Sequence, residues 1–148
     1  MVVYRITLSK WAESLTGSGF PARWNSKGVY VIYTAESRAL ACLENLVHRS
    51  GEGLNQQFSL VEISIPENTP IETVELNMLP KNWQHISNYS VCRQMGDDWV
   101  SNRSTLLLRV PSSIIRDEYN LLINPAHPDF KRVKIRHSVP FSFDERLM

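Results

Sequence analysis

The chain has 148 residues and a mass of 17.0 kDa, the size of one ordinary domain. Hydrophobic residues make up 43% and charged residues 21%, close to the averages for soluble globular proteins, which excludes a disordered or fibrous chain. The formal net charge is +1 and no basic run occurs, so the composition argues against direct binding to nucleic acid. We expect a single domain over residues 1–148 that binds a small molecule or a protein.

The cysteines and the apolar segments indicate in which cellular compartment the protein is found. Cys42 and Cys92 lack the CxxC spacing and are expected to be reduced thiols in the core. The N-terminus has no apolar stretch of the signal-peptide kind, and no segment approaches the roughly twenty apolar residues of a membrane span. The sequence therefore predicts a cytoplasmic protein with no membrane contact.

The first third of the chain alternates between strand and loop signals. Residues 2–7 are β-branched and aromatic, which predicts a strand, and residues 9–15 allow one helical turn. The segment TGSGFPARWNSKG (residues 16–28) is rich in glycine and small polar residues, so we expect a loop. The apolar run at 29–33 predicts a central strand buried on both faces.

A helix is expected after that strand, with Thr34 as its N-cap, Glu36 in its first turn and Gly51 at its end. Projection at 100° per residue places one broad apolar face on this helix, formed by Ala39, Leu40, Leu43, Leu46 and Val47. An adjoining stripe contains Ser37, Ala41, Glu44 and His48. A carboxylate and an imidazole should therefore lie beside the core.

The rest of the chain predicts mainly short strands separated by prolines. The candidates are strands at 58–65, 71–76, 104–111, 119–125, 131–136 and 139–143, and a helix at 89–95 ended by Gly96. Residues 78–98 are the least periodic. Seven or eight strands against one convincing helix predict an α+β fold with largely antiparallel pairing and few helices.

Common catalytic motifs are missing from the sequence. It contains no GxSxG, P-loop, GxGxxG or HExxH pattern. Glu44 and His48 are spaced like two ligands on one helical turn, but His85, His127 and His137 form no matching cluster, so no metal site is predicted. No spacing pairs a serine or cysteine nucleophile with a base.

One group of side chains suits a charged nucleotide. Arg23 offers a planar fork for phosphate oxygens, Tyr33 offers an aromatic face, and Glu44 could stabilise developing positive charge. Each residue also has an ordinary interpretation: a solvated loop arginine, a core tyrosine and a glutamate at the rim of a helix face. Spacing alone leaves both interpretations open.

Four segments of the chain together resemble a known family. They are RWNSKGVYVIYTAESRALACLENLVH, LLLRVPSSII, NLLINPAHPDF and FSFDERL, and they are similar to the RES domain, the toxin half of RES–Xre toxin–antitoxin pairs. The positions that match the family's arginine, glutamate and serine are Arg23, Glu44 and Ser112, with Ser113 as an alternative by one residue. Tyr33, Arg5 and His48 also match the family's pattern. Pro21 and Ala22 stand where the family usually has a second glycine.

The resemblance implies a fold like that of ADP-ribosyltransferases and cleavage of the nicotinamide–ribose bond of NAD+. NAD+ would be the substrate, and no cofactor is expected. By this resemblance the catalytic residues are Arg23, Tyr33, Glu44 and Ser112, and the residues that bind NAD+ are Arg5, Arg23, Trp24, Tyr33 and His48. Glu44 would stabilise the ribose oxocarbenium ion, and an arginine would hold the pyrophosphate.

The acceptor and the partners remain open at this stage. Water would make the protein a glycohydrolase, phosphate a phosphorylase, and a protein side chain a mono-ADP-ribosyltransferase. The resemblance implies growth arrest by NAD+ loss and an Xre-type helix-turn-helix antitoxin that covers the active site, so any DNA contact would be indirect. The chain could also form a homodimer. A noncatalytic interaction module on the same scaffold is the competing class, and the near-neutral charge disfavours an RNA-cleaving toxin.

Overall fold

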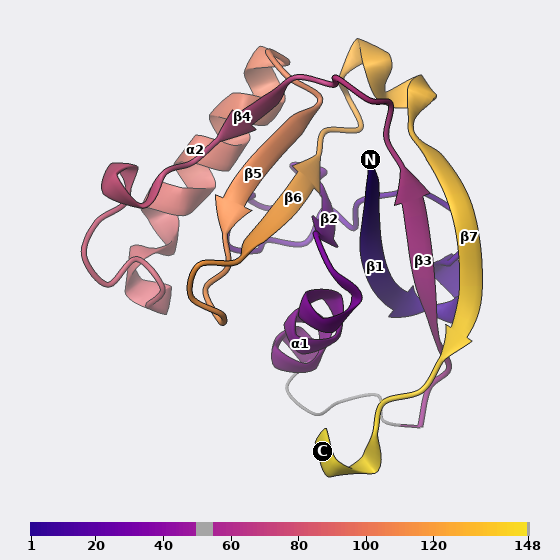
Figure 1. The fold of residues 1–148 in the computed structure, drawn as a ribbon. Helices are drawn as coiled ribbons and strands as arrows, with labels where there is room; N and C mark the ends of the chain where they lie inside the picture. Colours follow the sequence, from indigo (N-terminus) through magenta and orange to yellow (C-terminus); the bar gives the residue numbers. More distant parts are fainter. Residues whose placement is uncertain (50–54, 148) are drawn as a thin grey trace.

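The computed structural model describes residues 1–49 and 55–147 and has a single mixed sheet with two α-helices (Figure 1). The sheet has seven strands in the order β4-β5-β6-β2-β1-β3-β7. Every pairing is antiparallel except that of β4 with β5. The predicted α+β fold with mainly antiparallel strands and few helices is therefore confirmed.

The elements follow one another along the whole chain. The strands are β1 (Val2–Leu8), β2 (Ile32–Ala35), β3 (Phe58–Ser64), β4 (Ile71–Thr73), β5 (Leu107–Pro111), β6 (Tyr119–Ile123) and β7 (Lys134–Phe141). The α-helices are α1 (Arg38–Arg49) and α2 (Tyr89–Asn102). Short 3-10 turns occupy Ser9–Trp11, Leu76–Met78, Ile86–Asn88, Pro128–Arg132 and Glu145–Leu147. None of the described helices is long and apolar enough to cross a bilayer.

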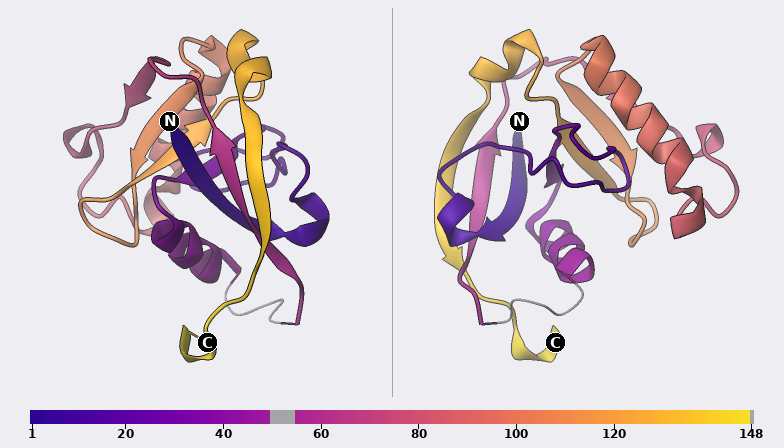
Figure 2. Two further views of the ribbon diagram at one scale, coloured as in Figure 1. Left: turned by 45° about the vertical axis from the view of Figure 1, so that its right-hand side comes forward. Right: turned by 180° about the vertical axis from the view of Figure 1, so that it is seen from behind.

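The two helices pack on different parts of the sheet. Helix α2 covers the β5–β6 half, where Cys92 and Trp99 share a buried cluster with Leu108 and Leu122. Helix α1 lies at one end of the sheet, between the β5–β6 half and the β1–β3–β7 half (Figures 1 and 2). That position brings α1 next to β1, β2 and the ends of β5 and β6.

The boundary between β2 and α1 differs from the prediction. The strand is Ile32–Ala35 rather than residues 29–33, and Thr34 belongs to it, donating a hydrogen bond to the Leu121 carbonyl at 2.6 Å. The prediction of Thr34 as N-cap, with Glu36 in the first turn, was therefore wrong. The Ser37 hydroxyl accepts from the Leu40 amide at 3.1 Å and caps the helix instead. The predicted end at Gly51 lies outside the described residues.

The buried face of α1 also differs from the projection. Leu40 and Ala41 are buried against β1 and β2, whereas Ala39 and Val47 are exposed. Because the helix has the sheet on one side only, its contact is centred on the stripe that contains Glu44. The predicted apolar face is thus partly turned to solvent, and Ala41 and Glu44 of the adjoining stripe face inward.

Helix α2 is longer than expected. It runs through Gly96 to Asn102, so the prediction that Gly96 ends a helix was wrong. A Cβ built on Gly96 would lie 1.7 Å from the Trp24 carbonyl oxygen, which shows that the helix backbone touches the loop before β2. The absence of a side chain at Gly96 allows this close approach. The last residue of the helix is Asn102, and Arg103 follows as its C-cap with φ of 51°.

Four smaller expectations concern short elements and the two cysteines. The helical turn near the N-terminus is limited to Ser9–Trp11, and β4 is only Ile71–Thr73. The two final strands are one continuous strand, β7, because its pairing with β3 continues across an irregularity at Glu62/Ile63. Both cysteines are free, with Cys92 buried and Cys42 partly exposed.

Candidate active site

A cavity of about 260 Å³ lies between α1, β1, β2 and the loop that precedes β2. Arg5, Tyr33, Glu44 and His48 all line it, so four of the residues singled out from the sequence meet at one place. Its other walls come from residues that the sequence did not single out, including Tyr4, Phe20, Asn25, Asn45 and Asn120.

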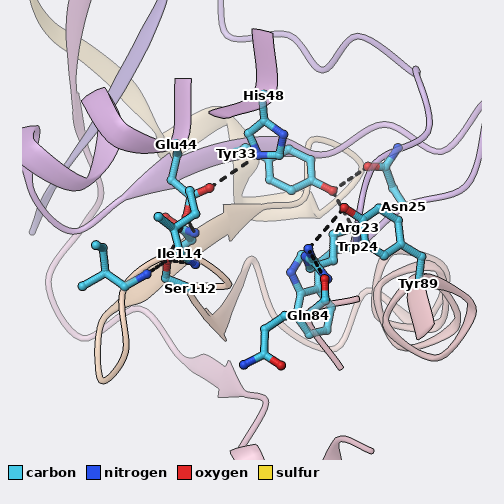
Figure 3. A network of polar contacts seen from close by, with 12 residues as sticks. Arg23, Trp24, Asn25, Tyr33, Glu44, His48, Gln84, Tyr89, Ser112 and Ile114 are labelled. Atoms are coloured by element: carbon cyan, nitrogen blue, oxygen red, sulfur yellow. Dashed lines mark hydrogen bonds and ion pairs between the residues drawn. The ribbon is translucent and has the colours of Figure 1, made fainter. Parts of the chain in front are cut away.

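The carboxylate of Glu44 is held by three side chains from three elements (Figure 3). Its Oε1 accepts hydrogen bonds from the Asn120 amide at 2.6 Å and the Ser112 hydroxyl at 2.9 Å. Its Oε2 lies 3.4 Å from Nε2 of His48, one turn later on α1. The side chain of Glu44 is only 16% exposed, while that of His48 is 60% exposed. The carboxylate is therefore fixed in direction at the cavity wall.

The surroundings of Glu44 keep it ionised. Burial alone would raise its pKa, but hydrogen bonds from His48, Asn120 and Ser112, together with the charge of His48, outweigh burial and lower the pKa from its ordinary value. Each donor stabilises the charged form. A permanent negative charge at neutral pH is the state needed to stabilise a cation in the cavity.

Ser112 acts on the cavity through Glu44. It follows β5 directly, is buried, and accepts hydrogen bonds from the amides of Ile114 and Ile115, both at 3.1 Å. With two donors pointing at it, the Ser112 hydroxyl can direct its own proton to Glu44. The hydrogen bond to Glu44 comes from Ser112, which decides between it and Ser113 as the serine of this network.

Tyr33 contributes its ring to the cavity and its hydroxyl to the loop. The hydroxyl donates to Oδ1 of Asn25 at 2.6 Å and accepts from the Trp24 amide at 3.2 Å. Burial raises the pKa of Tyr33 well above its ordinary value, against the lowering effects of the Trp24 amide and Arg93. The phenol therefore stays protonated at neutral pH.

Asn25 organises the loop between β1 and β2. Its amide donates to the carbonyls of Phe20 at 2.8 Å and Val29 at 2.9 Å, and only 2% of the residue is exposed. A side chain that joins two carbonyls and Tyr33 closes the loop on itself. No local signal in the sequence points to this role, because Asn25 stands among several small polar loop residues.

Arg5 is the cation of the cavity wall. It projects from β1, and one of its guanidinium nitrogens donates to the Thr16 carbonyl at 3.1 Å. Burial lowers its pKa, but an arginine titrates so far above neutrality that it keeps its charge. Its remaining donors can serve an anionic group.

Arg23 and Trp24 are not among the residues that line this cavity. The guanidinium of Arg23 donates to the carbonyls of Trp83 at 3.1 Å and Gln84 at 3.0 Å and lies 4.3 Å from the centre of the Tyr89 ring. The indole of Trp24 is 3% exposed and packs at 6.2 Å from Trp83. In this arrangement both side chains hold the loop against the segment before α2.

Ser112 also lines a second cavity, with a volume of about 390 Å³. Gln84, Ser112, Ser113 and Tyr119 line it. Arg23, which donates to Gln84, stands near it. Within residues 1–49 and 55–147, no three His, Cys, Asp or Glu side chains come together as a metal site.

Asn120 is the residue of the carboxylate network that the sequence did not predict. It lies on β6 opposite Ala35 of β2, and its amide points at Glu44. Its Oδ1 is buried without a partner in the described part of the chain. Only the pairing of β2 with β6 brings it to α1, and no local spacing could have shown that.

The RES domain model matches residues 2–144 of the chain. A protein of Sphingobium sp. (strain YBL2) called "Prs ADP-ribosylating toxin" is 41% identical over 93% of this chain and 88% of its own length. A protein of Photorhabdus laumondii called "Toxin Res" is 35% identical over 100% of this chain and 97% of its own length. A chain of the M. tuberculosis MbcT–MbcA toxin–antitoxin complex superposes with a TM-score of 0.77 at 18% identity, covering 95% of this chain and 84% of that one, and so shares the fold.

Proposed function

Because the chain belongs to the RES domain family, we propose that it is the toxin of a toxin–antitoxin pair and that it cleaves the nicotinamide–ribose bond of NAD+. The observation that carries the proposal is the Glu44 carboxylate, kept ionised at the wall of a cavity by Ser112, Asn120 and His48. A fixed negative charge in a partly desolvated site is the device expected for stabilising an oxocarbenium ion.

The reaction separates charge in a defined way. The bond between C1′ of the ribose and N1 of the pyridinium breaks, and its electron pair stays with the nitrogen, giving neutral nicotinamide. The ribose becomes positively charged and lies next to Glu44. An acceptor oxygen then bonds to C1′ and loses its proton. Tyr33 stays protonated, so the unprotonated form of His48, one helical turn from Glu44, is the group placed to take that proton.

Binding of the substrate is assigned to side chains of both strands and loop. Arg5, with its charge on the cavity wall, is the candidate for the pyrophosphate. Tyr33 offers its ring to the nicotinamide half. The guanidinium of Arg23 already donates to the carbonyls of Trp83 and Gln84. To bind NAD+, Arg23 must either give up one of these hydrogen bonds or use its remaining N–H donors.

The acceptor distinguishes three enzyme classes. Water gives ADP-ribose, phosphate gives ADP-ribose with a phosphate on that same C1′, and a protein side chain gives an ADP-ribosylated protein. We propose the first or second, in which NAD+ is degraded and growth stops. Transfer to a protein is the alternative, and it is favoured by the name of the Sphingobium relative.

Partners follow from the proposed toxin role. An Xre-type helix-turn-helix antitoxin would cover the cavity and keep the chain inactive, and the chain itself would not touch DNA. The structure that shares this fold was solved as a toxin–antitoxin complex, which supports an antitoxin partner. We place the reaction in the cytoplasm, where NAD+ is abundant.

Glu44→Gln tests the central assignment. The substitution keeps the shape and removes the charge, so we expect NAD+ consumption by the purified chain to fall at least about 100-fold, the order seen when an electrostatic group of an active site is lost. Mass spectrometry of the products with and without phosphate identifies the acceptor. Circular dichroism of the variant serves as the folding control.

Three results would contradict the proposal. Wild-type turnover by a folded Glu44→Gln chain would remove Glu44 from the chemistry. If cells that express the wild-type chain without an antitoxin keep normal NAD+ and grow, the noncatalytic interaction module is the better interpretation. NAD+-dependent labelling of a cellular protein with little net NAD+ loss would favour the transferase.

A further inference from the structure

Phe20 is a large apolar side chain that remains 76% exposed while it lines the cavity. Isolated exposed apolar residues are common on protein surfaces and need no explanation by themselves. Phe20 differs from Trp11, which is also exposed but lies outside the lining of the cavity. Its ring is thus available to whatever occupies this cavity.

The backbone that carries Phe20 is fixed in advance. The Asn25 amide holds the Phe20 carbonyl at 2.8 Å, and the Gly28 amide donates to the Gly19 carbonyl at 2.9 Å. Gly19 has φ of 73°, and a Cβ there would lie 2.8 Å from the Tyr30 ring, so the loop is packed on that ring. A ring presented on an ordered loop loses little entropy when a ligand covers it.

The size of the cavity limits what it can hold. Its volume of about 260 Å³ lies below the roughly 300–1,000 Å³ of sites for drug-sized ligands, so it accepts only part of a dinucleotide. Glu44 is the only carboxylate among the described residues of the lining. If the reacting ribose lies beside Glu44, the half of NAD+ in the cavity is nicotinamide riboside.

We propose that Phe20 stacks on the nicotinamide ring of NAD+ and is a substrate-binding residue of the cavity. The inference rests on the proposed NAD+ cleavage and adds to it the contact that recognises the leaving group. The ring is a cationic pyridinium before cleavage and is attracted to an aromatic face. A neutral aromatic ring also stacks on Phe20, so the contact stabilises the bound substrate and the transition state to a similar extent.

Steady-state kinetics of the purified chain test this role. Phe20→Ala should raise KM for NAD+ about tenfold, the usual size of a lost ring stack, and leave kcat within about twofold. Phe20→Tyr keeps the aromatic face and should restore KM to within about twofold of wild type. Trp11→Ala is the matched control, since it removes an exposed aromatic outside the cavity and should leave KM unchanged.

Ligand-binding measurements distinguish whether the nicotinamide ring or the adenine ring of NAD+ stacks on Phe20. Calorimetry on Glu44→Gln chains, which should not cleave the ligand, compares nicotinamide mononucleotide with ADP-ribose. Phe20→Ala should weaken nicotinamide mononucleotide about tenfold and ADP-ribose less than twofold. The reverse pattern would place adenine on Phe20 and overturn the proposal.

The outcomes separate this inference from the proposed function. If the wild-type chain consumes NAD+ and Phe20→Ala has an unchanged KM, NAD+ cleavage stands and the role of Phe20 is wrong. If a folded wild-type chain neither binds nor consumes NAD+, both fail. If Phe20→Ala weakens only the binding of an antitoxin, the ring belongs to a protein interface and the proposal is overturned.

Discussion

At the scale of single residues, Glu44 owes its charge to donors from three separate elements. His48 comes from its own helix, Ser112 from the end of β5, and Asn120 from β6. A buried carboxylate without such donors would become neutral at a higher pH. The network therefore sets both the ionisation and the direction of the group that faces the cavity.

Ser112→Ala should impair the reaction without removing the charge. The variant loses a donor to Glu44 and leaves the amides of Ile114 and Ile115 without their acceptor, so we expect about 1–2 kcal/mol of lost stability. The pKa of Glu44 should rise, which moves the acid limb of the pH–rate profile to higher pH. Ser113→Ala, the neighbouring serine outside this network, is the control. Equal effects of the two substitutions would contradict the assigned role.

Stability should also depend on pH through Glu44. Its pKa in the folded chain is lowered from the reference value of 4.5, so the ionised form stabilises the fold above about pH 4.5. This contribution is lost as the pH falls below 4.5 and through the folded pKa. Urea unfolding of the wild type and Glu44→Gln between pH 3 and 7 should show a steeper loss for the wild type at the acid end. Parallel curves would mean that the pKa of Glu44 is not lowered.

At the scale of elements, α2 and the loop before β2 are joined by backbone contact at Gly96. Asp97 strengthens the junction by accepting from the amide of Ser26 at 2.9 Å and from its hydroxyl at 2.5 Å. The loop that carries Arg23, Asn25 and Phe20 is thereby held by α2, the helix that packs on β5 and β6.

Gly96→Ala should disturb this junction. The added methyl would lie 1.7 Å from the Trp24 carbonyl, so helix and loop must separate, at a cost of about 1–3 kcal/mol. We expect a lower midpoint of urea unfolding and a raised KM for NAD+, because the loop also carries part of the cavity. Ser101→Ala, at an exposed position of α2, should change neither. A stabilised Gly96→Ala chain would show that the helix contact is looser than this distance implies.

Sequence patterns predicted well those elements whose structure is determined by residues close together in the chain. Strand composition and prolines located most strands, and the helical spacing of Glu44 and His48 placed the two side chains together. The errors arose where a distant partner decides the structure. Thr34 looks like a cap but bonds to Leu121 across the sheet, and Gly96 looks like a stop but meets Trp24.

The same distinction holds for the site. The resemblance to the RES family supplied Ser112, which has no local signal, and the structure places it on Glu44. Asn25 and Asn120 went unnoticed because their importance lies in contacts with Tyr33 and Glu44, respectively. Trp24 was expected at the substrate but lies in the core. Its position in a polar loop, directly after Arg23, gives no local sign of this burial. Its contact with NAD+ stays a prediction.

At the scale of the whole molecule, we expect the central strands of the sheet to be the best protected from amide hydrogen exchange. Strand β2 pairs with β6 over its whole length, β6 pairs with β5 over its whole length, and both have neighbours on both sides, whereas β4 is a three-residue edge strand. Amide hydrogen exchange should therefore be slowest at Leu121, Leu122 and Ile123 and faster in β4 by orders of magnitude. Mass spectrometry of peptides after exchange measures this order. Slower exchange in β4 than in β6 would contradict the strand order.

The carboxylate network also has a consequence for synthesis on the ribosome. Helix α1 is made early, but Ser112 and Asn120 are added more than sixty residues after Glu44. Until β6 pairs with β2, the growing chain has no complete carboxylate network, so a nascent chain lacks the site to which we assign NAD+ cleavage. Fragments that stop before β5 should be tolerated by a host without any antitoxin.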